Sequence, residues 1–289
     1  MREQIFSTGV NGDLLARIWS GDDASRGTLI LVHGLGDHSG RYERLAKQVV
    51  MHGWSLCGYD LPGHGRSPGK RGRTGSYDQL LADLSAVRDH LLSESPGVPH
   101  VILGNSMGGN LVLNYLLRRE HFGSNPIAPT GIILSSPMIL PPGNHQRPEV
   151  LAAWLTGHLF PRRRIHKPTA VEKLTSDHEQ AREHKDDPLT HSRIGLKLGT
   201  QLLAQGRWAL DHAREVDVPT LVMHGSEDDL IDQAACEHLS IRIGELAQYK
   251  VWPGLRHELY HDVTSDLVVD YLVQWLKQFI TNADDTNEP

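Results

Sequence analysis

Cysteine is scarce in this sequence. The 289 residues include only two, Cys57 and Cys236. They lie far apart, and neither belongs to a C-x-x-C pair or stands at the Cys/His spacing of a zinc site. This argues against a disulfide framework and predicts two buried free thiols and no metal site. A reducing compartment suits such thiols, so we expect a cytoplasmic protein.

Long apolar runs are also lacking. No stretch approaches the roughly 20 apolar residues that span a bilayer. The first 20 residues have no apolar core of the kind that marks a secretory signal. The net charge of −6 is weakly acidic, whereas a nucleic-acid-binding chain usually carries a basic excess. We therefore expect neither a membrane span nor a nucleic-acid partner.

Short apolar runs alternate with amphipathic stretches, a pattern typical of a mostly parallel sheet with helices packed on it. Asn11 and Gly12 form a strong hairpin signal, so the first two strands should be antiparallel. The predicted strands are residues 4–7, 14–19, 28–33, 54–60, 98–104, 131–136, 219–224 and 248–252. The clearest helices, with apolar residues at helical spacing, are residues 77–92 and 264–280.

Residues 138–215 interrupt this alternation. The segment is rich in Pro, Arg and His, has no strand-like run, and shows helical patterning at 150–159, 170–174 and 194–203. A segment of this length should carry structure of its own. We predict a helical cap at 138–215, inserted between the sixth and seventh strands of an eight-stranded core formed by 1–137 and 216–289.

A candidate nucleophile stands where a strand gives way to a helix. Gly104, Ser106 and Gly108 form the pattern G-x-S-x-G, with a predicted strand before it and a helical stretch, 110–117, after it. Such a turn exposes the serine hydroxyl at the N-terminus of a helix, where free N–H groups favour a developing negative charge. The alternative is an ordinary glycine-rich turn.

A second glycine-rich loop follows the strand at 28–33. His33 is followed by Gly-Leu-Gly, and acyl transfer requires two N–H donors aimed at the oxyanion. The residue after the nucleophile, Met107, supplies one donor in such sites, and we expect Leu35 to supply the other. His33 itself is predicted to brace the loop.

The base and the acid are expected in loops at the same edge of the sheet. Asp228 follows the strand at 219–224 in an acidic turn, and His257 follows the strand at 248–252 and a Pro-Gly turn. The chain order Ser, Asp, His is the one expected for a catalytic triad on such a sheet. The competing residues are His261 for the base and Glu227, Asp229 and Asp232 for the acid. His224, inside a strand, is predicted to be a packed core histidine.

Several of these segments closely resemble monoacylglycerol lipases and related bacterial lysophospholipase-like hydrolases of the α/β-hydrolase fold. The matching segments are 33–46, 59–67, 69–72, 104–109, 187–191, 225–228 and 254–258. One departure is Asn105, where that family usually has histidine. The resemblance covers about residues 5–279, and its core motifs are specific, whereas the middle of the cap is not.

The resemblance implies a lipid-type ester substrate under a helical cap that can contact a membrane surface transiently. No cofactor is implied. A general carboxylesterase, a thioesterase, a proline-type aminopeptidase and an acyltransferase would use the same triad, and a hydrolase-fold binding protein would have lost the chemistry. A basic run at 162–167 could meet anionic lipid or simply be solvated. Apolar cap residues could line a substrate pocket or pack within the cap: Trp154, Leu155, Leu159, Phe160, Leu198, Leu202, Leu203 and Trp208.

Overall fold

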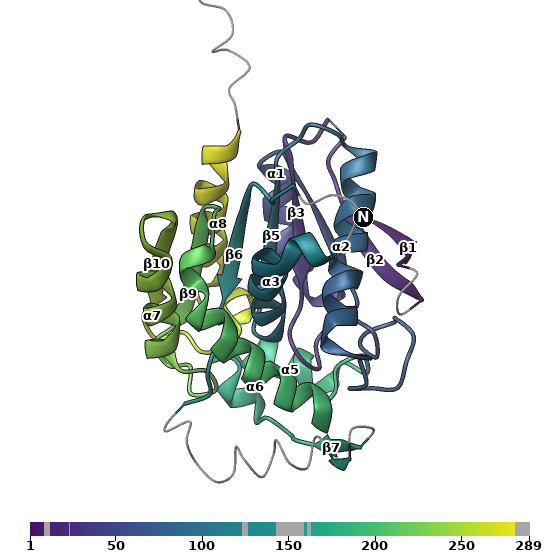
Figure 1. Ribbon diagram of the computed structural model, residues 1–289, viewed down its shortest axis with the longest axis vertical. Coiled ribbons are helices and arrows are strands. Elements are labelled where there is room, and N and C mark those ends of the chain that lie inside the picture. Colours follow the sequence, from purple (N-terminus) through teal and green to yellow (C-terminus); the bar gives the residue numbers. More distant parts are fainter. Residues whose placement is uncertain (9–11, 23, 123–126, 143–158, 161–162, 281–289) are drawn as a thin grey trace, which may run out of the picture.

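An eight-stranded sheet forms the centre of the computed structural model, which describes residues 1–8, 12–22, 24–122, 127–142, 159–160 and 163–280 (Figure 1). The strand order is β1-β2-β4-β3-β5-β6-β9-β10. β2 is antiparallel to both its neighbours, and every other pair is parallel. The strands are β1 (Arg2–Ser7), β2 (Asp13–Trp19), β3 (Gly27–Val32), β4 (Trp54–Tyr59), β5 (His100–Asn105), β6 (Gly131–Ser135), β9 (Thr220–Gly225) and β10 (Ala247–Trp252).

All eight predicted strands are present, with ends shifted by no more than two residues. The antiparallel pairing of the first two strands is also confirmed. Asn11, which carried the hairpin prediction, lies outside the described residues. The central strands are buried along their whole length, because helices cover both faces of a parallel sheet and leave no solvated side.

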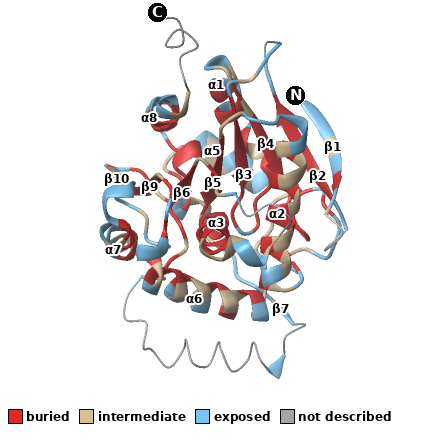
Figure 2. Ribbon diagram, turned by 45° about the horizontal axis from the view of Figure 1, so that its top comes forward, coloured by how far each residue is buried: buried red, intermediate tan, exposed pale blue. Residues whose placement is uncertain are grey.

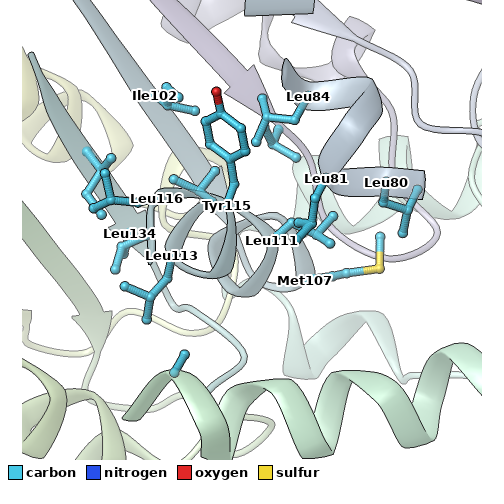
Figure 3. Close-up of a cluster of buried hydrophobic side chains, with 14 of the residues drawn as sticks. Leu80, Leu81, Leu84, Ile102, Met107, Leu111, Leu113, Tyr115, Leu116 and Leu134 are labelled. Atoms are coloured by element: carbon cyan, nitrogen blue, oxygen red, sulfur yellow. The ribbon is translucent and has the colours of Figure 1, made fainter. Parts of the chain in front are cut away.

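Two helices pack on one face of the sheet, and three on the other. α1 (Glu43–Met51) and α8 (Ser265–Leu276) share one apolar cluster with side chains such as Leu31, Leu103 and Met223. α2 (Tyr77–Glu94), α3 (Met107–Arg118) and α7 (Gln233–Ile243) share the other cluster with alternate residues of the same strands. Figure 3 shows the part of this second cluster around α3, where leucines from α2 meet those of α3.

The segment between β6 and β9 covers the carboxyl ends of the strands. It holds α5 (His178–Asp186) and α6 (Leu196–Asp211), which Figure 1 places at the lower end of the sheet. The insertion point predicted from the sequence, between the sixth and seventh strands of the sheet, is therefore confirmed. The helical pattern at 170–174 appears as a single 3-10 turn, Val171–Lys173, and that at 150–159 lies almost wholly outside the described residues.

The expectation that this segment holds no strand was wrong. β7 (Arg164–His166) pairs antiparallel with β8 (Arg193–Gly195) in a separate two-stranded ribbon. A strand of three residues is too short to show the alternation of apolar and polar side chains that predicts a strand. Two of the three residues in each strand are polar or glycine, so the sequence has no apolar run there. The helix expected at 194–203 starts at Leu196, because Ile194 belongs to the ribbon.

α6 is fixed to α3, the helix that follows Ser106. The Asn110 side-chain amide donates to the backbone carbonyls of Met138 (2.7 Å) and Leu202 (3.2 Å). A β-carbon at Gly206 would come within 2.0 Å of a neighbouring backbone oxygen, so only glycine permits this close approach of α6. The face of α6 toward the core is buried and its outer face is not (Figure 2).

Within the described part of the chain, no helix combines the length and the apolar character required to cross a membrane.

Candidate active site

Ser106 occupies a sharp turn between β5 and α3. Its backbone has φ 53° and ψ −114°, a left-handed conformation that costs a residue other than glycine on the order of 1–3 kcal/mol. Backbone bonds hold the turn: the Ser106 N–H donates to Ser135 O (2.9 Å), and the Ser106 carbonyl accepts from the Met138 N–H (3.0 Å). Strain of this kind persists only where the surroundings impose it, which indicates a functional position.

The two glycines of G-x-S-x-G are required by close packing. A β-carbon at Gly104 would lie 2.4 Å from the Gly108 carbonyl oxygen, and one at Gly108 would lie 2.0 Å from the Val32 oxygen. Any larger residue would push α3 away from β3 and β5. The pattern therefore predicted the turn for the correct physical reason.

A continuous hydrogen-bonded line joins Ser106, His257 and Asp228. His257 Nε2 lies 2.9 Å from Ser106 Oγ, and His257 Nδ1 lies 2.8 Å from Asp228 Oδ2. Because an ionised carboxylate only accepts hydrogen bonds, Nδ1 carries the proton and Nε2 is left to accept from the serine hydroxyl. The structure thus brings together the three residues that the sequence predicted, from three different loops.

The environment raises the basicity of His257. Burial alone would lower its pKa, but the charge of Asp228 and the hydrogen bond to it outweigh burial and raise the pKa above its usual 6.5. Burial would likewise raise the Asp228 pKa, but His257 and the backbone N–H of Leu230 lower it overall. Asp228 Oδ1 accepts from the N–H groups of Leu230 (2.9 Å) and Ile231 (3.2 Å), which fix the carboxylate toward the ring.

A second histidine lies close to the same carboxylate. His224 is fully buried in β9, as predicted, and its Nε2 is 3.5 Å from Asp228 Oδ2. Its Nδ1 donates to the Gly225 carbonyl (2.9 Å), burial lowers its pKa, and its Nε2 has no hydrogen-bond partner in the described structure. His224 therefore packs beside Asp228 without bonding to it.

The competing residues lie elsewhere. His261 is buried against the Tyr42 ring, with 5.1 Å between ring centroids. Asp229 pairs with Lys173 (2.6 Å), and Asp232 caps α7 by accepting from the Ala234 N–H. Asp228 is the one of these acids for which a hydrogen bond to His257 is found in the described structure.

The loop after β3 lies against the nucleophile. A β-carbon at Gly34 would stand 3.4 Å from Ser106 Cβ, so the loop and the serine are in contact. His33 braces this loop as predicted: its Nδ1 donates to Gly34 O (2.8 Å), and its Nε2 accepts from the Leu61 N–H (3.0 Å). Leu35 and Met107 both line the cavity above the serine. As the first residue of α3, Met107 has an N–H with no partner within the helix.

The cap contributes to this loop. The His191 N–H donates to the Gly36 carbonyl (2.9 Å), and Gly36 has φ +77°, where a β-carbon would meet His191 O at 2.0 Å. His38 Nε2 also lies 2.8 Å from the carboxylate of Asp187. The segment 187–191 therefore holds the loop after β3 from the cap side.

Sequence reasoning missed a buried cluster of charged side chains next to His257, formed by Asp37, Arg41 and Glu258 and called the Arg41 cluster below. Arg41 binds Glu258 with both guanidinium nitrogens (3.1 and 2.7 Å) and Asp37 with one (3.1 Å). Burial opposes ionisation of Glu258, but Arg41 lowers its pKa to about 2. All three residues lie in segments that resemble the lipases, so the residues were visible, but no local pattern pairs positions 41 and 258.

A cavity of about 220 Å³ opens over Ser106 and His257. Its apolar walls come from Leu35, Met107, Met138, Leu174, Ile194, Leu230 and Ile231. Its polar lining includes Lys167, Thr169, His184, His191 and Ser192 from the cap. None of the apolar cap residues proposed from the sequence that the structure describes lines this cavity: Leu198 and Leu202 belong to the core, Leu159 and Phe160 are exposed, and Trp154 and Leu155 lie outside the described residues.

Among the described residues, no group of three or more His, Cys, Asp or Glu side chains could hold a metal ion. The absence of a cofactor stays a prediction. The site contains a strained serine, Ser106, at the carboxyl edge of the sheet. Its hydroxyl is hydrogen-bonded to the His257 imidazole, which is hydrogen-bonded in turn to the Asp228 carboxylate. On a sheet of this strand order, with a cap inserted after the sixth strand, that makes the protein an α/β-hydrolase.

The chain belongs to the serine aminopeptidase S33 family, whose model matches residues 23–264. Among its relatives, an uncharacterized abhydrolase domain-containing protein of Dictyostelium discoideum is 29% identical over 93% of this chain, which spans only 28% of that protein's length. A monoacylglycerol lipase of Mycolicibacterium smegmatis is 29% identical over 90% of this chain and 92% of its own length. The crystal structure of Paleococcus ferrophilus monoacylglycerol lipase is similar with a TM-score of 0.81, at 26% identity, over 92% of this chain and 99% of that one.

Proposed function

We propose that the protein hydrolyses carboxylic esters, with Ser106 as nucleophile, His257 as base and Asp228 as the acid that orients the imidazole. The observation that carries this proposal is the line of two hydrogen bonds from Ser106 Oγ through His257 to Asp228. A serine hydroxyl is a weak nucleophile unless a base accepts its proton, and the contact between His257 Nε2 and Ser106 Oγ supports that role for the imidazole.

In the proposed mechanism Ser106 Oγ attacks the ester carbonyl carbon as its proton passes to His257 Nε2. The N–H groups of Leu35 and Met107 stabilise the oxyanion of the tetrahedral intermediate. Collapse of the intermediate breaks the ester C–O bond, and the alcohol leaves with the proton from His257. Water, deprotonated by His257, then cleaves the acyl-enzyme and restores Ser106. Asp228 stabilises the imidazolium in both steps.

The substrate class is proposed to be monoacylglycerols or lysophospholipid-type lipid esters. The apolar side chains over Ser106 suit an acyl chain, and relatives named monoacylglycerol lipase align with most of the chain. In this proposal residues 138–215 act as the cap and residues 1–137 and 216–289 as the catalytic core. The cap would contact a membrane surface transiently to collect the substrate.

The cytoplasm is proposed as the compartment. Cys57 and Cys236 are both buried free thiols, which a reducing environment preserves. Burial raises the pKa of Cys57 to about 12, so its reactive thiolate is not formed at neutral pH.

The family's name raises a second candidate, removal of an amino-terminal residue from a peptide. Such a reaction requires a carboxylate that holds the substrate's ammonium group. The carboxylates that line the cavity, Asp37 and Glu258, are both bound to Arg41, and within the described residues the cap lines the cavity with Lys167 but with no acid. This charge arrangement favours the ester substrate over the peptide.

The proposal is tested with three substrate series offered to the wild type and to Ser106→Ala. The series are p-nitrophenyl esters of increasing chain length, 1-monoacylglycerols of the same chain lengths, and amino-acid p-nitroanilides. We expect the wild type to hydrolyse long-chain monoacylglycerols and the variant to lose the activity by several orders of magnitude. Activity on short esters alone would reduce the proposal to a general carboxylesterase.

Preferential cleavage of the anilides would support the aminopeptidase instead. If wild type and variant are equally inert on all three series, the proposed function is wrong.

A further inference from the structure

Positive charge is concentrated in one region of a chain whose net charge is negative. Three segments, residues 61–77, 159–171 and 188–210, contain no Asp or Glu. Their cations without a carboxylate within 4 Å in the described structure are Lys70, Arg71, Arg73, Arg163, Arg164, Lys167, Arg193 and Lys197, called the basic patch below. Elsewhere many cations are paired, among them Arg17, Arg41, Arg44, Lys47, Arg119 and Lys173.

Backbone contacts bring the three segments together. The Gly195 N–H donates to Gly72 O (2.9 Å), and the Arg164 guanidinium donates to Arg71 O (2.7 Å). A β-carbon at Gly72 would lie 2.2 Å from Arg193 O, so the core loop is seated directly on β8. The basic patch therefore spans the core loop at 69–73 and the β7–β8 ribbon of the cap.

The ribbon exposes Arg193 and His166 to solvent, whereas Arg164 is half-buried. His166 stands opposite Arg193, and Arg164, two residues earlier, points to the same side. On the other side Ile194 is buried, while Ile165, opposite it, stays partly exposed. Figure 2 shows β7 largely coloured as exposed at the edge of the molecule.

Large apolar side chains accompany these charges. Leu159, Phe160 and Ile165 are 68%, 52% and 42% exposed. The Arg163 guanidinium lies 5.7 Å from the centre of the Phe160 ring. Exposed apolar side chains among lysines and arginines are the combination that inserts at a lipid–water interface.

The same elements border the catalytic cavity. Three residues of this region line the cavity over Ser106: Ile194 within β8, and Lys167 and Ser192 next to the ends of the ribbon strands. Burial, and then the charge of Arg71, lower the pKa of His191 in this cavity to about 4. A surface that binds the basic patch would therefore lie next to the cavity.

A shallow hollow of about 320 Å³ lies within the patch. Lys70, Arg73 and Thr74 line it together with the backbone of Gly69 and Gly75. The Thr74 side chain is 2% exposed, and its hydroxyl has no hydrogen-bond partner in the described structure. A buried hydroxyl without a partner is costly, and Thr74 lines the hollow beside two cations, so a ligand there that accepts a hydrogen bond would supply the missing partner.

We propose that the basic patch binds the phosphate headgroups of an anionic lipid surface and places the catalytic cavity at that surface, with one phosphate seated in the hollow at Lys70, Arg73 and Thr74. The inference rests on the proposed lipid-ester function and specifies the lipid that the cap and the core loop contact together. A nucleic acid would match the charge alone, whereas a lipid surface also accounts for the exposed apolar side chains and for the neighbouring cavity.

The test is vesicle binding by protein carrying Ser106→Ala, which leaves the lipid intact. Flotation is compared on phosphatidylcholine vesicles with and without phosphatidylglycerol. We expect binding to the anionic vesicles only, weakened by salt. The variant Lys70→Gln/Arg73→Gln/Arg193→Gln should weaken it by about 100-fold, since each cation near an anionic surface contributes roughly five-fold. The matched control, Lys47→Gln/Arg214→Gln/Lys277→Gln, removes three exposed cations outside the patch and should bind like the parent.

A separate variant, Thr74→Val, keeps the shape of the side chain and removes only the hydroxyl. It should bind anionic vesicles about three-fold more weakly, with a melting temperature no lower than that of the parent because the lost hydroxyl had no partner, even if the triple variant does not fold. Equal binding by patch and control variants, or equal binding to neutral vesicles, would overturn the inference, as would binding to single-stranded RNA but not to anionic vesicles. Because no turnover is measured, vesicle binding by a chain that cleaves no lipid ester would contradict the proposed function and leave this inference standing.

Discussion

Two buried carboxylates, Asp228 and Glu258, raise the pKa of His257, and they have different partners. Asp228, after β9, faces the ring and bonds to Nδ1 at 2.8 Å. Glu258, the next residue along the chain, turns away from the ring to Arg41 and lies near His184 of the cap, at 3.6 Å. The backbone N–H of Glu258 also donates to Leu174 O in the cap (2.8 Å).

Asp228 and Glu258 are both buried and both negatively charged, but their different partners give them different roles. In the proposed mechanism the Asp228 carboxylate acts on the imidazole, because backbone N–H groups aim it there and no Lys or Arg side chain pairs with it in the described structure. The charge of Glu258 is compensated by Arg41, so its contribution is to hold the histidine loop between core and cap. We therefore expect changes at Asp228 to affect chemistry and changes at Glu258 to affect stability.

The largest expected effect is that of Asp228→Asn on turnover. The amide keeps the size of the side chain but cannot stabilise the imidazolium, and it favours the wrong tautomer of His257. We expect kcat for a p-nitrophenyl ester to fall by about 10⁴-fold, with the melting temperature changed little. A loss below about ten-fold would place the acid elsewhere, and Asp229→Asn serves as the control on the neighbouring residue.

Glu258→Gln should lower the stability of the protein and change turnover little, the opposite of Asp228→Asn. It leaves Arg41 buried with one carboxylate in place of two, and breaking a buried ion pair costs on the order of 3 kcal/mol. We expect the free energy of unfolding, measured in urea, to fall by about that amount, while kcat falls by less than about ten-fold. Glu227→Gln, an exposed acid nearby, is the matched control. A turnover loss as large as that of Asp228→Asn would show that the two carboxylates do not differ in role.

The stability of the protein should fall on mild acidification. Burial and the charge of Arg41 lower the pKa of His261 to about 4, below its unfolded value of 6.5. The unfolded chain therefore binds a proton first, and stability is lost as pH falls from about 6.5 toward 4. At pH 4.5 this residue alone should cost on the order of 2 kcal/mol. Urea unfolding at pH 7 and pH 5 would measure the slope, which His261→Asn should reduce.

The smallest expected effect is a shift in the acid limb of the pH–rate profile. His257 acts as a base only when neutral, and its pKa is raised, so kcat/KM should rise with pH through a pKa above 6.5. Asp228 is the larger source of the increase and Glu258 a smaller one. In Glu258→Gln the limb should therefore move to lower pH by less than about one unit. A shift of the acid limb to higher pH in Glu258→Gln would contradict the prediction that the Glu258 charge raises the pKa of His257.

The sheet and the triad could be predicted from the sequence because their signals are local. Strand ends, the glycines around Ser106 and the turns before Asp228 and His257 each lie within a few neighbouring residues. A parallel sheet brings the carboxyl ends of its strands to one edge, so the loops that carry these residues meet there.

The Arg41 cluster and the β7–β8 ribbon could not be predicted in the same way. Arg41 and Glu258 are 217 residues apart, and their pairing depends on how the turn before α1 and the histidine loop meet. The ribbon strands are three residues long, and their partners come together only in the folded cap. The sequence showed the basic run at 162–167, but the contribution of the loop at 69–73 to the same surface required the structure.

The central claim is that His257 activates Ser106 as a nucleophile, and the most direct test is covalent labelling. The protein would be treated with a fluorophosphonate probe, and the adduct located by peptide mass mapping in the wild type and in His257→Gln. The account predicts one adduct, on Ser106, formed rapidly in the wild type and at a rate lower by several orders of magnitude in the variant. An adduct on another residue, or labelling of Ser106 at the same rate without His257, would contradict it.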